Sequence, residues 1–371
     1  MPMRGRTKSS VETAERLPRP LGPSGEPGND RLTEHGMGVA RLPTVSVIIA
    51  AFSMKRWNDM REAVASVEAQ TVPVLETIVV IDHHPGLLAR ARRELHGVTV
   101  IANGGGQGAS AARNAGVMAS RGELVAFLDD DAVASPHWLE ALLSHFTDTS
   151  VVGVGGRLNP LWATSRPRWF PPEFDWAVGA SYLGMPQSAE PVRNVWSNNM
   201  AIRRGAFDMV GGFRDNFGKL GARSRPEDTD LCLRTAEKHG GGAWIYEPGA
   251  IADHRVPMER TTLRYFAYRC FNEGLGKAEL AALNGTSESI STERRYTTSV
   301  LPSALARGVR EIHRGDASGA LRNLAILTGF TVVIIGYLVG HTMLIVRATS
   351  FWHRLFGVRR PTLGNGHRGE Q

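Results

Sequence analysis

Short apolar runs alternate with amphipathic stretches through the first part of the chain. The apolar runs are rich in β-branched residues, which predicts buried strands; they cover residues 44–52, 76–82, 98–102 and 124–128. The intervening stretches predict helices; they cover residues 58–70, 86–95, 107–119 and a segment from about Pro136 with Ser135 as its cap. Strands that alternate with helices in this way predict an α/β fold, with a mostly parallel sheet and helices on both faces.

The alternation ends after an apolar run at residues 151–157. A loop rich in aromatic residues and proline follows, from Pro160 to Pro191. The later pattern predicts the remaining elements: helices at 229–239 and 262–283, and a strand at 243–246. An amphipathic helix is predicted by apolar residues at helical spacing, namely Leu301, Leu305, Val309 and Ile312.

One long segment, residues 324–346, contains no Asp, Glu, Lys or Arg. As a helix it would be roughly 35 Å long, enough to cross a hydrocarbon core of about 30 Å. A buried core helix is the alternative, although core helices rarely run this far without a charge. The sequence therefore predicts a transmembrane helix, with basic residues on both sides that assign no orientation.

Composition limits the class of protein. The chain has 371 residues, 42% of them hydrophobic, which is enough for one large domain with appendages. Cys232 and Cys270 are expected to be reduced thiols, since neither has a Cys or His nearby at metal spacing. The net charge of +7 permits anionic partners. Nucleic acid is not expected among them, because no zinc finger, basic zipper or RNA-recognition motif is present.

These patterns divide the chain into five parts. The first is polar, rich in Pro and Gly, and lacks the apolar core of a signal peptide. The expected parts are a disordered tail at 1–43, a catalytic domain at 44–290, an amphipathic helical linker at 291–323, the transmembrane helix at 324–346 and a basic tail at 347–371.

Aspartates follow two of the predicted strands. Asp82 closes the second strand, and Asp129, Asp130 and Asp131 come directly after the apolar core of the fourth. The carboxyl ends of parallel strands form the edge at which such sheets bind ligands. Clustered carboxylates are tolerated when a cation neutralises them, and hard oxygen ligands suit Mg2+ or Mn2+. The sequence therefore predicts a divalent-cation site at this edge.

A glycine cluster offers a second function. Gly104, Gly106 and Ala109 fit the G-x-G-x-x-A pattern of dinucleotide-binding folds, with Asp129 as the acid that binds a ribose. An NAD(P)-dependent oxidoreductase is therefore the alternative hypothesis. Two observations count against it: the motif follows the third strand instead of the first, and Asp130 and Asp131 would have no role.

The chain resembles the family 2 glycosyltransferases, of the membrane-associated bacterial type, which have the GT-A fold. The resemblance covers about residues 44–283. It is carried by an ordered set of motifs: "VSVIIAAF", Asp82, "GASAARNAG", the aspartates 129–131, "PEDTDLCLR" and "YEPGAIADH". The family transfers a sugar from a nucleotide diphosphate with a divalent metal and inversion at the anomeric carbon. One departure is the "IDHHPG" sequence around Asp82, where family members often carry a serine or an acidic run.

The resemblance implies roles for individual residues. Donor-binding residues would be Ala50, Ala51, Asp82, Arg113, Asp129 and Asp130. Metal ligands would be Asp131, Asp129 and His254. Asp228 would be the catalytic base, and Asp230 a helix N-terminal acid. Acceptor-binding residues would be Trp196, Asn198 and Asn199.

Together these features predict an inverting glycosyltransferase that moves a sugar from a nucleotide-sugar donor to a hydroxyl of a glycan or lipid-linked acceptor. Its expected place is the cell membrane, with the catalytic domain in the cytoplasm. Aromatic residues of the proline-rich loop could stack on sugars, lie at the lipid interface or simply pack; they are Trp162, Trp169, Phe170, Phe174 and Trp176.

Overall fold

A computed structural model describes residues 43–355, apart from 215–216, 221–222 and 285–290. The tail predicted at 1–43 and residues 356–371 of the predicted basic tail lie almost wholly outside this range. The main sheet has nine strands: β1 (Val45–Ala51), β2 (Glu76–Ile81), β3 (Thr99–Ala102), β4 (Leu124–Asp129), β5 (Ala132–Ala134), β6 (Val151–Trp162), β7 (Glu190–Val192), β8 (Asn199–Arg203) and β11 (Ala243–Val256). A separate two-stranded ribbon pairs β9 (Lys219–Leu220) with β10 (Arg223–Ser224).

The strand order is β3-β2-β1-β4-β8-β6-β11-β5, and β7 also pairs with β11. Strands β1 to β4 pair in parallel, as do β6 and β11. β8 is inserted antiparallel between β4 and β6, and β5 and β7 run antiparallel to β11. The sheet is therefore mixed, and the predicted parallel arrangement describes its first half.

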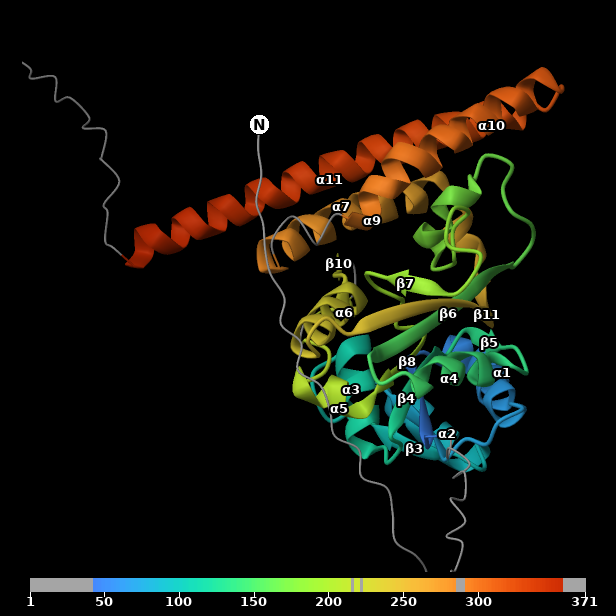
Figure 1. The fold of residues 1–371 in the computed structure, drawn as a ribbon, viewed down its shortest axis with the longest axis vertical. Helices are drawn as coiled ribbons and strands as arrows, with labels where there is room; N and C mark the ends of the chain where they lie inside the picture. Colours follow the sequence, from blue (N-terminus) through green and yellow to red (C-terminus); the bar gives the residue numbers. More distant parts are fainter. Residues whose placement is uncertain (1–42, 215–216, 221–222, 285–290, 356–371) are drawn as a thin grey trace, which may run out of the picture. The chain divides into compact units, whose positions relative to one another are not determined.

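Helices cover both faces of the sheet, as predicted (Figure 1). The α-helices are α1 (Trp57–Glu68), α2 (Pro85–Glu94), α3 (Ala109–Ala119), α4 (Trp138–Leu143), α5 (Arg204–Met209), α6 (Glu227–Lys238), α7 (Leu263–Asn284), α9 (Ser291–Arg295), α10 (Leu301–His313) and α11 (Ser318–Leu355). Side chains alternate along each strand: Val47 and Ile49 of β1 pack with α1, α2 and α4, whereas Ile48 packs with α3, α5 and α6. The cap predicted at Ser135 is wrong, because α4 begins at Trp138 and no side chain caps it.

The proline-rich loop contains more regular structure than its sequence indicated. β6 continues to Trp162, and a 3-10 helix, η3 (Pro172–Val178), and β7 follow. Phe170 and Phe174 are buried in a third apolar cluster with α7, α10 and α11. Of the three roles considered for the aromatic residues, these two rings therefore have the packing role. Trp176 contributes to the wall of a pocket and donates a hydrogen bond to the hydroxyl of Tyr296, in the π-helix η5 (Tyr296–Val300).

The C-terminal helices pack on one another at very close range. α11 runs alongside α7 and α10 (Figure 1). A Cβ at Gly336 would overlap the carbonyl oxygen of Phe271 in α7, and one at Gly274 would overlap that of Val333 in α11. Small residues therefore let the two backbones touch.

α11 is longer at both ends than the predicted transmembrane segment. It takes in Ser318 to Asn323 from the predicted linker and residues 347–355 from the predicted tail. Among the described residues, one stretch, Ser318–Val346, is long and apolar enough to cross a membrane. The predicted amphipathic stripe lies on α10, where Leu301 is buried, but Val309 and Ile312 are exposed.

Candidate active site

The aspartates predicted to bind metal lie at the carboxyl end of β4, in the middle of the sheet. The chain turns at Asp130 and Asp131 and returns as β5, which pairs antiparallel with β11. This pairing sets His254 opposite Ala132, next to Asp131. His254 Nε2 lies 3.4 Å from Asp131 Oδ1, and one ligand atom from each of Asp129, Asp131 and His254 falls within 4.8 Å of the others.

This donor set fits a divalent cation. Two carboxylates and an imidazole are suitable ligands for Mn2+ or Mg2+. Asp131 and His254 are buried, and both Asp131 Oδ1 and His254 Nδ1 lack a hydrogen-bond partner among the described residues. Buried polar atoms without partners are rare, and a cation held between these residues would give both of them a ligand to bind.

Two arginines that the sequence analysis missed also contact the aspartates. Arg56 places Nη1 2.7 Å from Asp130 Oδ1 and Nη2 2.9 Å from Asp131 Oδ2. Arg260 Nη2 lies 3.8 Å from Asp131 Oδ2. Burial raises the pKa of Asp130 to about 7, although the charge of Arg56 opposes this. Burial would also raise the pKa of Asp131, but contacts with His254, Arg56 and Arg260 lower it below its usual range.

Arg113, predicted to bind the donor, connects the strand-end carboxylates to α6. Its Nη2 lies 2.8 Å from Asp129 Oδ1, and its Nη1 lies 3.5 Å from Glu227 Oε1. Glu227 and Asp228 both stand in the first turn of α6. Burial, and then the neighbouring charge of Asp228, raise the pKa of Glu227 to about 8. Burial also raises the pKa of Asp228, against the lowering effect of Arg113.

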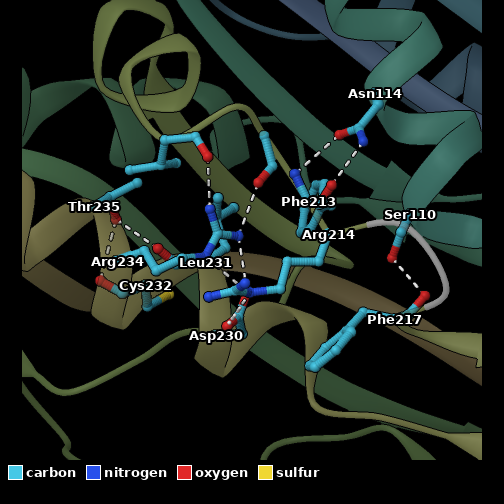
Figure 2. Close-up of polar contacts among 12 residues, drawn as sticks. Ser110, Asn114, Phe213, Arg214, Phe217, Asp230, Leu231, Cys232, Arg234 and Thr235 are labelled. Atoms are coloured by element: carbon cyan, nitrogen blue, oxygen red, sulfur yellow. Dashed lines mark hydrogen bonds and ion pairs between the residues drawn. The ribbon is translucent and has the colours of Figure 1, made fainter. Parts of the chain in front are cut away.

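A separate network holds the first turns of α6 in place (Figure 2). Asp230 is fully buried and pairs with Arg214 at 2.9 Å and Arg234 at 2.8 Å. Arg234 also donates to the carbonyl oxygens of Val210 and Gly212. Asp230, the expected helix N-terminal acid, is therefore also the centre of a structural ion cluster. It does not line the pocket that Asp228 lines.

Asp228 lines a pocket of about 690 Å³ between the catalytic sheet and the C-terminal helices. The backbone N–H of Ser197 donates to Asp228 Oδ2 at 3.4 Å. Trp196, predicted to bind the acceptor, also lines the pocket. The opposite wall is apolar and comes from α11: Phe330, Val333, Ile334 and Tyr337.

Two basic side chains of this pocket, Arg193 and Lys277, are paired with acids, and the sequence analysis assigned neither of them to a site. Arg193 Nη1 lies 2.7 Å from Glu293 Oε2. Lys277 Nζ lies 3.0 Å from Glu273 Oε1 and also pairs with Glu293. Because these residues come from separate elements without a motif, no local signal marks them.

Asn199, predicted to contact the acceptor, is a structural residue. Its Oδ1 accepts from Trp138 Nε1 at 2.7 Å, and its Nδ2 donates to the carbonyl oxygens of Arg157 and Ala250. The side chain is buried, and these bonds join β8 to β6 and β11, so it does not reach the pocket. Asn198 is outside the pocket wall too, with a buried Oδ1 that lacks a partner among the described residues.

The remaining predicted donor residues lie at the same edge of the sheet. Ala50 and Ala51 end β1, and Asp82 follows β2. Asp82 accepts hydrogen bonds from Asn103 Nδ2 at 2.7 Å and from the backbone N–H of Gly108 at 2.9 Å. Its carboxylate therefore holds the glycine-rich loop against the sheet.

Comparison with known proteins identifies the family to which this chain belongs. Residues 46–211 match the family described as glycosyl transferase family 2. The glucosyl-dolichyl phosphate glucuronosyltransferase of Haloferax volcanii is 33% identical over 238 residues, which cover 63% of this chain and 76% of that protein. The succinoglycan biosynthesis protein ExoM of Rhizobium meliloti is 31% identical over 175 residues, covering 47% and 53% respectively.

Among solved structures, the fold is similar to that of the mannosyltransferase PcManGT from Pyrobaculum calidifontis, in complex with GDP-Man and Mn2+. The TM-score is 0.53 and the identity 18%, with 82% of this chain and 88% of that one covered. The protein is thus a glycosyltransferase with the GT-A fold. It belongs to glycosyl transferase family 2.

The oxidoreductase alternative finds no support. The loop of Gly104 and Gly106 follows β3, which is an edge strand, and it is tied to Asp82. A dinucleotide fingerprint instead follows the central first strand of its fold.

Proposed function

We propose that the protein transfers a sugar from a nucleotide-diphosphate donor to a hydroxyl of a lipid-linked glycan, with inversion. The observation that carries the proposal is that two clusters of acidic residues lie close together at one end of the sheet. Asp129, Asp131 and His254 form a cluster that suits a metal, and Arg113 joins Asp129 to the α6 turn of Asp228.

The donor would bind at the ends of β1, β2 and β4. Ala50 and Ala51, at the end of β1, would border the nucleoside, and Asp82 keeps the glycine-rich loop in position. Asp129, Asp131 and His254 would hold Mg2+ or Mn2+, which neutralises the charge of a departing nucleoside diphosphate. The solved relative PcManGT contains GDP-Man and Mn2+, which supports this choice of partners.

Asp228 would remove the proton of the acceptor hydroxyl. It faces the pocket, and burial raises its pKa, so its carboxylate is a stronger base than an exposed aspartate. A base on the acceptor side lets the hydroxyl oxygen attack the anomeric carbon as the nucleoside diphosphate leaves from the opposite side. The result is inversion.

The pocket supports a hydroxyl acceptor carried by a lipid. Its basic residues Arg193 and Lys277 already pair with Glu293, so the polar part suits a neutral sugar better than a free anion. Its far wall is apolar and belongs to α11. The Haloferax relative is named for a glucosyl-dolichyl phosphate substrate, which is a sugar on a lipid phosphate. We therefore place the enzyme at the cell membrane, attached through α11, with the catalytic domain on the cytoplasmic side.

A titration of the full-length protein in detergent tests the donor assignment. Labelled nucleotide sugars should bind with Mn2+ and only weakly without it, and NAD(P) should not bind. The Asp131→Asn variant should lose the metal-dependent part of the affinity while its melting curve remains cooperative. Donor binding that is the same with and without Mn2+ in the wild type would contradict the metal assignment.

A further inference from the structure

One face of α11 is apolar, exposed and without charge. Residues at 51–63% exposure recur along it in helical register: Leu321, Leu324, Leu327, Leu338, Ile345 and Val346. Thr328 and Thr331 lie between them, also exposed. An exposed apolar surface of this length marks a binding surface for lipid or protein, since monomers seldom expose such patches to water.

The other face of α11 is covered by protein along most of the helix. α10 packs on its first turns, where Asn323 Nδ2 donates to the carbonyl oxygen of Leu305. From Ile326 to Gly340 it packs on the third apolar cluster and on α7. Beyond Gly340, residues 341–355 span about 22 Å at ~1.5 Å per residue, which is too short for a hydrocarbon core of about 30 Å.

The covering helix α7 is not suited to hydrocarbon. It carries Arg269, Glu273 and Lys277 in the stretch that runs beside α11, and these side chains reach the polar part of the pocket. If α11 crossed the bilayer, this charged stretch would lie near the middle of the membrane. Charged groups at the centre of a spanning helix oppose insertion and are rare there.

The pocket leads to the same conclusion. Phe330, Val333 and Tyr337 stand near the middle of the apolar part of α11 and line the cavity that holds Asp228. A crossing helix would therefore bring the base to the bilayer centre, out of reach of a water-soluble nucleotide sugar. In the plane of the membrane, the same helix keeps the pocket at the interface, and Ile334 lies in both the pocket wall and the exposed surface.

We infer that α11 lies along the surface of an anionic bilayer, with its exposed face among the acyl chains, and does not span it. This placement rests on the proposed function, because it brings a lipid-linked acceptor beside the pocket. Charge on the neighbouring helix fits the partner. α10 exposes Val309, Arg310 and Ile312, and Arg314 is exposed directly after its last residue. Neither guanidinium forms an ion pair within the described part of the chain.

Depth measurements on the full chain test the orientation. Single cysteines at Leu321, Ile335 and Ile345, labelled with an environment-sensitive dye, span about 36 Å of helix. The native Cys232 and Cys270 are buried and should not react. With quenchers at known depths in phosphatidylcholine–phosphatidylglycerol vesicles, all three dyes should lie about 5–10 Å below the surface of one leaflet. A dye at position 335 in the bilayer centre, with the other two in opposite leaflets, would overturn the inference.

Flotation with the same vesicles tests the surface itself. Leu338→Glu should weaken vesicle binding about tenfold or more. The variant loses one leucine side chain that the bilayer would bury, and it places a charge at the interface instead. Met118→Glu is the matched control, since Met118 is 85% exposed on α3, and it should bind as wild type. Arg310→Gln should cost roughly fivefold on anionic vesicles and nothing on neutral ones.

The protein could instead fail to bind vesicles and form a dimer that Leu338→Glu disrupts. That result would show that a second copy covers this face, and it would overturn the inference. Donor titration in detergent is the separate readout for the proposed function. Normal donor binding together with dye depths typical of a spanning helix would refute only the proposed orientation of α11. Loss of specificity for nucleotide sugars would refute the proposed function, whatever the depth of the dyes.

Discussion

Replacing Asp228 by asparagine keeps the size of the side chain but removes the proton acceptor from the pocket. Loss of a general base typically slows an enzyme by about 10²–10⁴-fold, and that is the expected fall in transfer rate. Donor and metal affinity should change little, because the proposed metal ligands are Asp129, Asp131 and His254.

The same change should not destabilise the protein. Burial raises the pKa of Asp228 above its value in the unfolded chain, so the fold disfavours the charged form. A carboxyl of this kind costs stability as the pH rises from its unfolded pKa to its folded pKa, and the cost remains at neutral pH. Asp228→Asn removes that cost, and the melting temperature should stay the same or rise.

Asp230 in the same helix provides the opposing control. It is fully buried between Arg214 and Arg234, and it has no contact with the pocket. Breaking a buried ion pair by removing one partner typically costs about 3–5 kcal/mol. Asp230→Asn should therefore lower the melting temperature by roughly 10 °C, while the surviving folded enzyme keeps its rate per molecule at low temperature.

The assay measures transfer rate, donor affinity with Mn2+ and melting temperature for the wild type and both variants. A pH profile adds a fourth readout. The wild-type rate should rise with pH through an apparent pKa above that of an ordinary aspartate. Because the charge of Asp228 acts on its neighbour Glu227, this apparent pKa belongs to the pair of carboxyl groups. Equal loss of rate and donor affinity in Asp228→Asn would make the residue part of the donor site. Normal transfer would require another base or an acceptor that is already anionic.

Three further changes follow from the contacts of the site and the helices. Asp131→Asn should abolish metal-dependent transfer without unfolding the protein, as judged by turnover and thermal melting; unchanged turnover would exclude Asp131 as a ligand. Arg56→Gln should lower the melting temperature in chelator, because Arg56 neutralises both Asp130 and Asp131, and added Mn2+ should raise it by more than in wild type. An equal Mn2+ effect in both proteins would mean that Arg56 does not compete for this charge. Gly336→Ala should destabilise by about 1–3 kcal/mol through the clash with Phe271, whereas Gly205→Ala, which meets open space in α5, should be neutral or stabilising; equal melting of the two variants would refute the close packing of α7 and α11.

Much of the first half of the fold could be predicted because its signals are local. A buried strand between two helical layers needs apolar side chains on both faces, and residues 45–51 and 124–128 show such runs. The aspartates could be placed because they directly follow β4, and the carboxyl end of a parallel strand is where such sheets bind ligands. The family motifs then supplied roles that the pattern alone did not.

The partners of these residues could not be predicted in the same way. Arg56 and Arg260 carry no motif, and their contacts with Asp131 depend on elements far apart in the chain. Asn199 has the sequence neighbours of a binding residue, yet it is a buried connector of three strands. A polar residue beside a strand can serve either purpose, and only its surroundings in the folded protein distinguish them.

By itself, the sequence determined the local elements, the position of the aspartates at a strand end and the apolar character of residues 324–346. The tertiary structure decided that β11 returns beside β5, which brings His254 to Asp131, and that α7 covers one face of α11. The physical reason is the range of the forces involved. Hydrogen bonding and side-chain periodicity within an element are encoded by neighbouring residues. Strand register and helix contacts depend instead on packing between residues that are far apart in the chain. A helix that is apolar on every side does not reveal which side the protein will cover.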